Sequence, residues 1–347
     1  MSVRIQWKRA ERVFAGLLED LRLKRGPYAT AKVPHDNENF PIVMERGGIT
    51  EARFLFVVCF YMRGGIKSDM AFKSLGKLFE MSPQLFVGDY SSANDGVRYR
   101  QQIETQLPLV GLKNRAYDVS EIWVANMTKI DKFWSGDPRK LIEGTTSFKT
   151  LVQRIVSREE GDGRFDQYSS NGFLGFREKM VSMLAYFLMD CGLVEFYQLP
   201  VPVDFHVLRV LFSNRLLTCR EEQVQADNPQ MLAAARRLVD QYCRSNDVSW
   251  LKLCDCLWLL SRTYCRKQLG NRSRFGKING RRTEVFAVEH DWEVGDRVGT
   301  YENTCAQCSA CETCVFNIPS ATYYRKGILH KRGKRPVPPV GTKTRHS

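Results

Sequence analysis

The chain has 347 residues, of which 43% are hydrophobic and 26% charged, and its net charge is +14. This composition excludes a disordered or fibrous chain, and the apolar stretches are all shorter than the roughly 20 residues of a membrane span. The first residues lack the apolar core and cleavage site of a secretory signal. The sequence therefore predicts a soluble globular protein.

Apolar residues recur with a helical period along most of the chain. Between residues 180 and 188, for example, five apolar residues fall on one face of a helix. In chain order, we expect helices at 5–23, 51–62, 69–80, 118–134, 147–158, 178–191, 205–217, 229–244 and 248–265. We also expect one short strand, at 283–288. The pattern predicts an all-α fold.

Composition divides the chain into parts. We expect an N-terminal extension (1–45), a helical core of two lobes (46–265), a basic insertion (266–304), a cysteine-rich loop (305–314) and a basic tail (315–347). Within the core, the central helices (about 110–200) would form one lobe. The other would join the helices of 46–105 to those that follow residue 204.

The positive charge is concentrated in two late segments. Residues 262–282 hold eight Lys and Arg residues and residues 313–347 hold eight more, with no acidic residue in either segment. The rest of the chain is therefore close to neutral. Clustered Lys and Arg residues neutralise phosphates and release counterions, so we expect nucleic acid as a partner. A solvated basic tail is the alternative interpretation of residues 331–347.

The chain has eleven cysteines, an odd number that cannot be fully paired in a secreted disulfide framework. This indicates a reducing compartment. Cysteines crowded three apart favour a metal over disulfides, because their thiols readily point at one centre. Four cysteines lie within ten residues in this way: Cys305, Cys308, Cys311 and Cys314. Six others lie in apolar helical patterns and are expected to be small buried residues: Cys59, Cys191, Cys219, Cys243, Cys254 and Cys256.

Asp204 stands between an extended apolar approach and a helix. Pro200 and Pro202 hold the approach extended, because a residue before proline avoids the α region. The simplest interpretation of Asp204 is an N-cap that only accepts hydrogen bonds from backbone amides. The apolar residues before it also imply that its carboxylate emerges from a packed surface, where a helix N-terminus fixes it and a cleft can use it.

The stretch Val203–Val210 (VDFHVLRV) resembles the catalytic stretch of the helix-hairpin-helix DNA glycosylase superfamily, the group that contains endonuclease III and the oxoguanine glycosylases. It matches the family pattern Val-Asp-x-His-Val-x-Arg-Val at every specified position. The resemblance implies that Asp204 assists departure of a base, by stabilising positive charge on the sugar or by activating the nucleophile. It also implies a two-lobed helical fold in which Lys179 and Asp204 line the cleft, and a base that is extruded from the duplex.

The stretch Gly172–Met180 (GFLGFREKM) is similar to the hairpin of the same family. There, a Leu-Pro-Gly-Val-Gly-x-Lys hairpin grips a DNA phosphate with its amides, and in bifunctional members a lysine at its end forms a Schiff base with the sugar. Leu174, Gly175 and Lys179 align with this pattern, whereas its proline and second glycine are absent. The resemblance implies phosphate contact at Gly175 and lyase chemistry at Lys179. The alternative is an exposed lysine in the first turn of a helix.

The cysteines resemble those of the iron-sulfur branch of the family, in which a Leu/Trp-rich helix end delivers one ligand and a Cys-x2-Cys-x5-Cys loop delivers three. Cys265, followed by Cys305, Cys308 and Cys314, has this arrangement, although 39 residues separate the first two. The alternative set replaces Cys265 with Cys311. Either set implies a structural 4Fe–4S cluster, with zinc as the competing metal.

We therefore expect an enzyme, a DNA N-glycosylase with or without lyase activity at abasic sites. The 25 positions from Lys179 to Asp204 are closer to the archaeal oxoguanine glycosylases than to endonuclease III. The expected contacts to double-stranded DNA are Gly175, Arg209, Arg272, Arg274 and Lys277.

We expect a monomer without membrane contact in the cytoplasm or nucleoid, or in the nucleus of a eukaryote, where KRGKR at 331–335 would serve as a signal. Two alternatives stay open. One is an enzyme of the same fold that modifies a thymine-derived base in place. The other is a non-enzymatic, metal-stapled nucleic-acid-binding protein in which Asp204 only caps a helix.

Overall fold

The computed structural model describes residues 3–36, 39–62, 68–112, 119–145, 147–156, 168–218, 229–265, 273–278, 281–286, 308–310 and 313–314. Most of these residues are helical, as expected for an all-α fold. The chain divides into two compact units: unit 1 is Met1–Lys32 with Pro200–Ser347, and unit 2 is Val33–Leu199. Within the described ranges, every helix is too short or too polar to cross a membrane.

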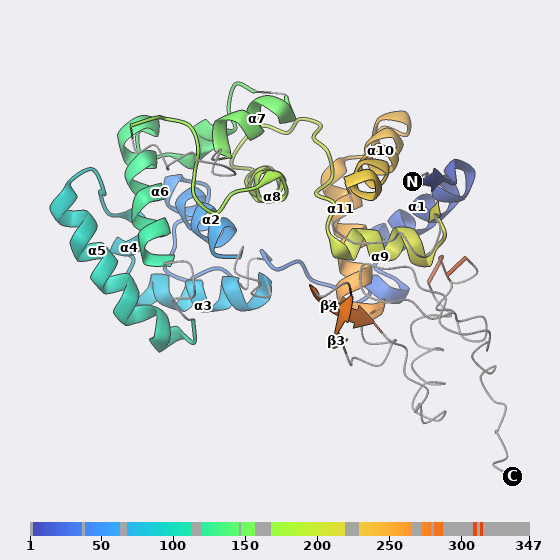
Figure 1. Cartoon of the computed structure of the whole chain (residues 1–347), viewed down its shortest axis with the longest axis horizontal. Coiled ribbons are helices and arrows are strands. Elements are labelled where there is room, and N and C mark those ends of the chain that lie inside the picture. The colour runs from blue at the N-terminus through green and yellow to red at the C-terminus, as the bar shows by residue number, and fades with distance from the viewer. Residues whose placement is uncertain are drawn as a thin grey trace, which may run out of the picture. The chain divides into compact units, whose positions relative to one another are not determined.

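Unit 2 is built around one apolar helix. Its elements are α2 (Ile49–Met62), α3 (Ser68–Met81), α4 (Gln84–Val87), α5 (Ala93–Gln106), η3 (Leu107–Val110), α6 (Val119–Trp134), η4 (Pro138–Leu141), α7 (Phe148–Ile155) and α8 (Glu178–Asp190). In α2, all residues from Glu51 to Tyr61 are buried, the pattern of a helix with neighbours on every side. It packs against α3, α4 and α8 (Figure 1) and against the 3-10 helix η4.

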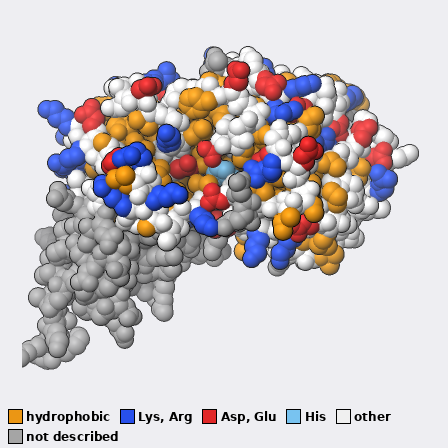
Figure 2. All heavy atoms as spheres, turned by 180° about the vertical axis from the view of Figure 1, so that it is seen from behind, with side chains coloured by type: hydrophobic (Ala, Val, Ile, Leu, Met, Phe, Trp, Pro, Cys, Tyr) orange, Lys and Arg blue, Asp and Glu red, His pale blue; other side chains and the backbone are white. Residues whose placement is uncertain are grey.

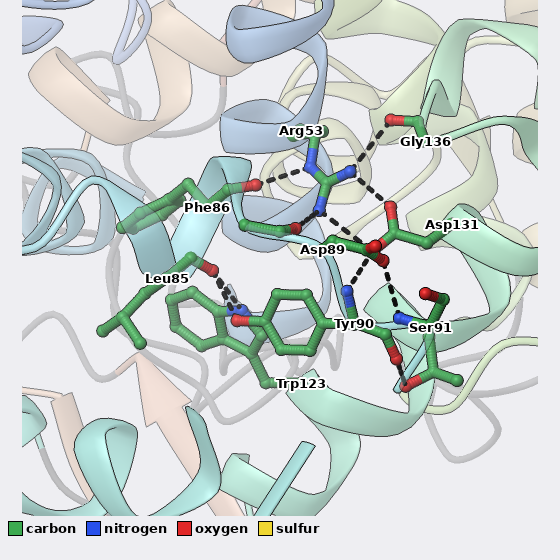
Figure 3. A network of polar contacts seen from close by, with 11 residues as sticks. Arg53, Leu85, Phe86, Asp89, Tyr90, Ser91, Trp123, Asp131 and Gly136 are labelled. Carbon is green, nitrogen blue, oxygen red and sulfur yellow. Dashed lines mark hydrogen bonds and ion pairs between the residues drawn. The ribbon is translucent and has the colours of Figure 1, made fainter. Parts of the chain in front are cut away.

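A charged pair lies inside this apolar core. Arg53 of α2 and Asp131 of α6 are both buried and form an ion pair. The Arg53 guanidinium also donates to the carbonyl oxygens of Phe86 and Gly88, and Asp131 accepts from the Tyr90 amide at 2.7 Å (Figure 3). Because both charges have several polar partners, the cost of burying them is offset, and the pair joins α2 and α6 to the end of α4.

Unit 1 joins the N-terminal segment to the second half of the chain. Its elements are β1 (Arg4–Ile5), α1 (Trp7–Arg22), η1 (Gly26–Tyr28), α9 (Phe205–Ser213), β2 (Leu217–Thr218), α10 (Pro229–Ser245), α11 (Trp250–Leu259), the π-helical turn η6 (Leu260–Cys265), β3 (Ser273–Ile278) and β4 (Arg281–Phe286). The amphipathic α1 buries Val13, Phe14 and Leu17 and packs against α11 (Figure 1). β1 pairs antiparallel with β2, with Arg4 opposite Thr218.

The grouping of the helices differs from the expectation in two places. The helices within 46–105 pack in unit 2 with the central helices, and not with those after residue 204, because α3 and α8 cover the apolar α2. Residues 1–32 are an integral part of unit 1, not an extension, because α1 contributes an apolar face to its core. The strand expected at 283–288 is confirmed for 283–286, where β4 pairs antiparallel with β3.

Candidate functional site

Asp204 is the N-cap of α9. It follows a largely buried stretch without regular secondary structure, residues 199–203. Its backbone is extended, and its Oδ1 accepts hydrogen bonds from the amides of His206 (2.7 Å) and Val207 (3.1 Å). These two bonds fix the orientation of the half-buried carboxylate, and the positive end of the helix dipole stabilises its negative charge. The structure thus confirms the cap and its packed surroundings.

A buried serine contacts two further residues of the same motif. Ser261 of η6 accepts hydrogen bonds from Nη1 of Arg209 at its carbonyl oxygen (2.8 Å) and at Oγ (3.1 Å). Its Oγ also lies 3.1 Å from Nδ1 of His206. Arg209 is only 8% exposed. This placement corrects the expected role of Arg209: its guanidinium lies inside unit 1, where it holds η6 against α9 instead of presenting charge to a DNA phosphate.

The segment that the sequence aligns with the family hairpin directly precedes α8. We call its residues 171–177 the hairpin segment. Gly172 and Gly175 have φ values of +79° and +81°, in the left-handed region that favours glycine. Gly175 is buried, whereas Lys179 is exposed in the first turn of α8. The glycine conformations suit a tight turn just before α8. Phosphate contact at Gly175 and lyase chemistry at Lys179 stay predictions.

Two buried side chains of α6, which we call the α6 clamp, hold the hairpin segment. Asn126 donates from Nδ2 to the Leu174 carbonyl oxygen (2.9 Å) and accepts at Oδ1 from the Leu174 amide (2.8 Å). Lys129 donates from Nζ to the carbonyl oxygens of Asn171 and Gly172, each at 2.7 Å. A satisfied buried polar network rigidifies the backbone that it binds. The clamp thus fixes the backbone of residues 171–174 from a neighbouring helix.

Asn126, Lys129 and Ser261 are not among the residues that the sequence predicts for the site. A lysine in a helix is ordinarily solvated, and the partners of Lys129 lie 42 and 43 residues further along the chain. The available signal is weak: Asn126 and Lys129 are three residues apart, and hence on one helix face, beside the apolar Met127 and Ile130. Ser261 carries no signal of its own.

The cysteine-rich loop is described in part. Cys308 and Cys314 are half-buried, and the amides of Thr313 and Cys314 both donate to the Ala310 carbonyl oxygen, at 3.1 and 3.0 Å. Cys265 ends η6, and only its backbone is described. The other two expected ligands, Cys305 and Cys311, lie outside the described residues. With two of the five candidate thiols described, the described residues hold no group of three or more metal-binding side chains.

The other expected basic DNA contacts lie in or, along the sequence, next to β3. Arg274 and Lys277 are on β3, paired with Val285 and Arg282 of β4 in the backbone register, and Arg272 lies outside the described residues. On the face shown in Figure 2, Lys and Arg side chains are interspersed with Asp and Glu side chains over the described surface. The concentration of positive charge is therefore argued from the sequence of the two late segments.

No protein-family model matches the chain, and neither a curated protein nor a solved structure gives a significant match. The likeness to DNA glycosylases therefore rests on the motif around Asp204, the hairpin and the cysteine spacing. Lys179 belongs to unit 2 and Asp204 to unit 1. The expectation that both line one cleft stays a prediction.

Proposed function

We propose that the chain binds double-stranded DNA, extrudes a modified or mismatched base and cleaves its N-glycosidic bond. One observation carries the proposal. Asp204, in a sequence that matches the glycosylase motif, is a half-buried carboxylate fixed by two amides at the N-terminus of α9. A fixed carboxylate is the group that this reaction needs.

The chemistry follows from the charge that develops on the sugar. As the bond between C1′ and the base breaks, its electron pair leaves with the base and the sugar becomes oxocarbenium-like. A negative charge already oriented by backbone amides stabilises this cation without reorganisation during the step. Water, or the amine of Lys179 in a bifunctional enzyme, then adds to C1′.

The hairpin segment supports the DNA-binding half of the proposal. Hydrogen bonds from the α6 clamp hold its backbone. Gly172 and Gly175 allow the left-handed conformations that this backbone adopts. A preorganised backbone binds a phosphate with less loss of entropy than a mobile one. Lys179, exposed in the first turn of α8, follows this segment directly. The basic β3–β4 region adds sequence-independent attraction to the DNA backbone.

The cysteine loop supports a structural metal centre as part of the same proposal. Cys308 and Cys314 are half-buried in one loop that contains a hydrogen-bonded turn. The full candidate set consists of thiols alone, which suits a 4Fe–4S cluster or zinc. Together with Cys305, the ligands would be completed by Cys265 or Cys311. The centre would crosslink late segments of unit 1 and take no part in bond cleavage.

A panel of duplexes that carry different damaged or mismatched bases tests this function. We expect the wild-type protein to release a free base from at least one duplex. Asp204→Asn, which still caps α9, should bind the same duplex but release base slower by orders of magnitude. Asp137→Asn is the matched control, because Asp137 also caps a helix, η4, but lies outside the motif. Normal turnover by Asp204→Asn would remove this residue from the mechanism.

One observation favours a second candidate, a nucleic-acid-binding protein without enzymatic activity. The two hydrogen bonds described for the Asp204 carboxylate come from the backbone of its own helix, as in an ordinary cap. DNA binding without base release from any duplex of the panel would support this candidate. An altered base that stays in the polymer would instead indicate base modification.

A further inference from the structure

The cysteine segment (308–314, described at 308–310 and 313–314) contacts the N-terminal helix α1. The Ser309 amide donates to Oδ2 of Asp20 at 2.9 Å, and Oδ1 of Asp20 accepts from Nε of Arg25 at 2.7 Å. Asp20 is 1% exposed and lies in the last turn of α1. A carboxylate is unfavourable there, because the C-terminal end of a helix dipole is negative. Its two donors offset this cost, and one of them belongs to the cysteine segment.

Gly16, one helical turn before Asp20 on the same face of α1, gives the segment room. A Cβ atom at Gly16 would lie 2.8 Å from Cβ of Ser309, closer than such atoms pack. A glycine inside a helix costs about 1 kcal/mol relative to alanine. The close approach of Ser309 gives this glycine a physical reason, because the missing Cβ leaves space on α1 for the Ser309 side chain.

The other end of the segment contacts α9. Oγ1 of Thr313 donates to Oδ1 of Asn214 at 2.9 Å, and Asn214 is buried at the C-cap of α9. Ala310, between the two contacts, is 2% exposed. The cysteine segment is therefore packed on unit 1 at both ends, with Cys308 beside the α1 contact and Cys314 beside the α9 contact.

We propose that the cysteine segment docks on α1. Metal binding by the segment and packing of α1 against the rest of unit 1 would then stabilise each other. The inference rests on the proposed metal centre and is independent of base excision. Ligands held in place by neighbouring groups bind a metal more tightly than mobile ones. By linkage, the bound metal then stabilises the packed state of α1 to the same extent.

A pair of substitutions tests the docking. Gly16→Ala raises the helix propensity of α1 but adds the Cβ that meets Ser309, and we expect it to weaken Zn²⁺ binding by about 10-fold or more. Ser309→Gly deletes the other atom of the clash, so the double variant should regain most of the affinity of the wild type. Gly76→Ala in α3 is the matched control, because a Cβ there has ordinary contacts, the nearest at 3.6 Å. It should bind metal like the wild type.

Hydrogen exchange measures the reverse effect. Removing the metal with a chelator should speed amide exchange in α1, whereas α3 in unit 2 should exchange as before. Iron with sulfide serves as a second probe beside Zn²⁺. The proposal is overturned if Gly16→Ala binds metal as tightly as the wild type, or if adding Ser309→Gly fails to restore the affinity of that variant. It is also overturned if the amide exchange rate of α1 is the same with and without metal. A wild-type protein that binds neither metal also overturns it. Base release is measured separately, so a failure of the docking proposal is distinguished from a failure of the proposed enzyme activity.

Discussion

Arg209 of α9 donates two hydrogen bonds from one guanidinium nitrogen to Ser261 of η6. His206, one turn before Arg209, meets the same serine. Since η6 ends at Cys265, this contact links the helix that carries Asp204 to the segment that carries a candidate metal ligand. The two polar residues of the motif that follow Asp204, His206 and Arg209, thus contact Ser261 inside unit 1. We infer that they position α9 and do not touch the substrate.

The first prediction concerns the amine of Lys179. If Lys179 is the Schiff-base nucleophile, borohydride added during turnover will join the wild-type protein covalently to DNA, and Lys179→Gln will not be trapped. Lys149→Gln, which removes an exposed lysine from α7 of the same unit, is the control and should be trapped normally. Trapping that persists in Lys179→Gln would mean that another amine acts. No trapping in the wild type would indicate a monofunctional glycosylase that uses water.

The second prediction concerns the α6 clamp. Asn126→Ala removes the Asn126 partners of the Leu174 amide and carbonyl. This change should lower the free energy of unfolding by about 1–3 kcal/mol. We expect faster hydrogen exchange at the Leu174 amide and weaker DNA binding, with the same choice of base. Thr128→Ala is the control, because Thr128 lies on α6 but bonds to the Tyr90 carbonyl oxygen. An unchanged exchange rate at Leu174 in Asn126→Ala would contradict the clamp.

The third prediction concerns the basic β3 region. Charge reversal at Arg272, Arg274 and Lys277 should weaken binding to all DNA sequences alike and reduce the salt dependence by roughly one unit of slope for each phosphate that is no longer neutralised. The base selected should not change, because phosphate contacts position the protein without specifying sequence. Reversal at Lys73 and Lys77, both exposed in α3, is the control. An unaltered salt slope after the triple reversal would exclude these residues from the interface.

The fourth prediction concerns the metal ligands. Purified without oxygen, the protein should be brown with broad visible absorbance from thiolate-to-iron charge transfer. Either Cys265→Ser or Cys311→Ser should bleach this absorbance, and the variant that does so identifies the fourth ligand. Cys191→Ser is the control, since Cys191 lies outside the candidate set. A colourless protein with stoichiometric zinc would replace the iron-sulfur assignment by a zinc site.

The fifth prediction concerns alkaline pH. Burial raises the pKa of the Cys256 thiol to about 12 and that of the Tyr242 phenol to about 12. In the unfolded chain the pKa is about 8.5 for the thiol and about 10 for the phenol. The folded chain therefore retains protons that the unfolded chain loses, and the free energy of unfolding should fall as pH rises from about 8.5 towards 12. Urea unfolding at several pH values measures this, and Cys256→Ala should reduce the slope. A flat profile would count against both pKa values.

Local sequence patterns predicted most helices, because a repeated apolar face is visible without any knowledge of the partner. α8 and α10 lie within a residue or two of their expected bounds. α5 was missed because its sequence, ANDGVRYRQQIETQ, is mostly polar and has little apolar face beyond Tyr99 and Ile103. The helix expected at 205–217 ends at Ser213, where Asn214 caps it and Arg215 has a φ of +54°.

The candidate site was predictable only where it is local. Asp204 and its cap bonds lie within four consecutive residues, so the sequence alone could predict the N-cap that the structure shows. The contact between Asp20 and Ser309 spans 289 positions, and no local pattern encodes it. The same holds for the buried Lys129, whose partners are backbone carbonyls that any sequence would offer. Tertiary packing alone brings such groups together.

The discontinuity of unit 1 imposes an order on folding during synthesis. Ile5 pairs with Leu217, and α1 packs against α11, so these partners of the N-terminal segment are absent until more than two hundred further residues have been made. At about 5–20 residues per second, α1 waits on the order of ten seconds or longer with its apolar face uncovered. Unit 2, which is continuous in the chain, can complete its core in that interval. On the ribosome, α1 therefore exposes an apolar face that a chaperone would recognise.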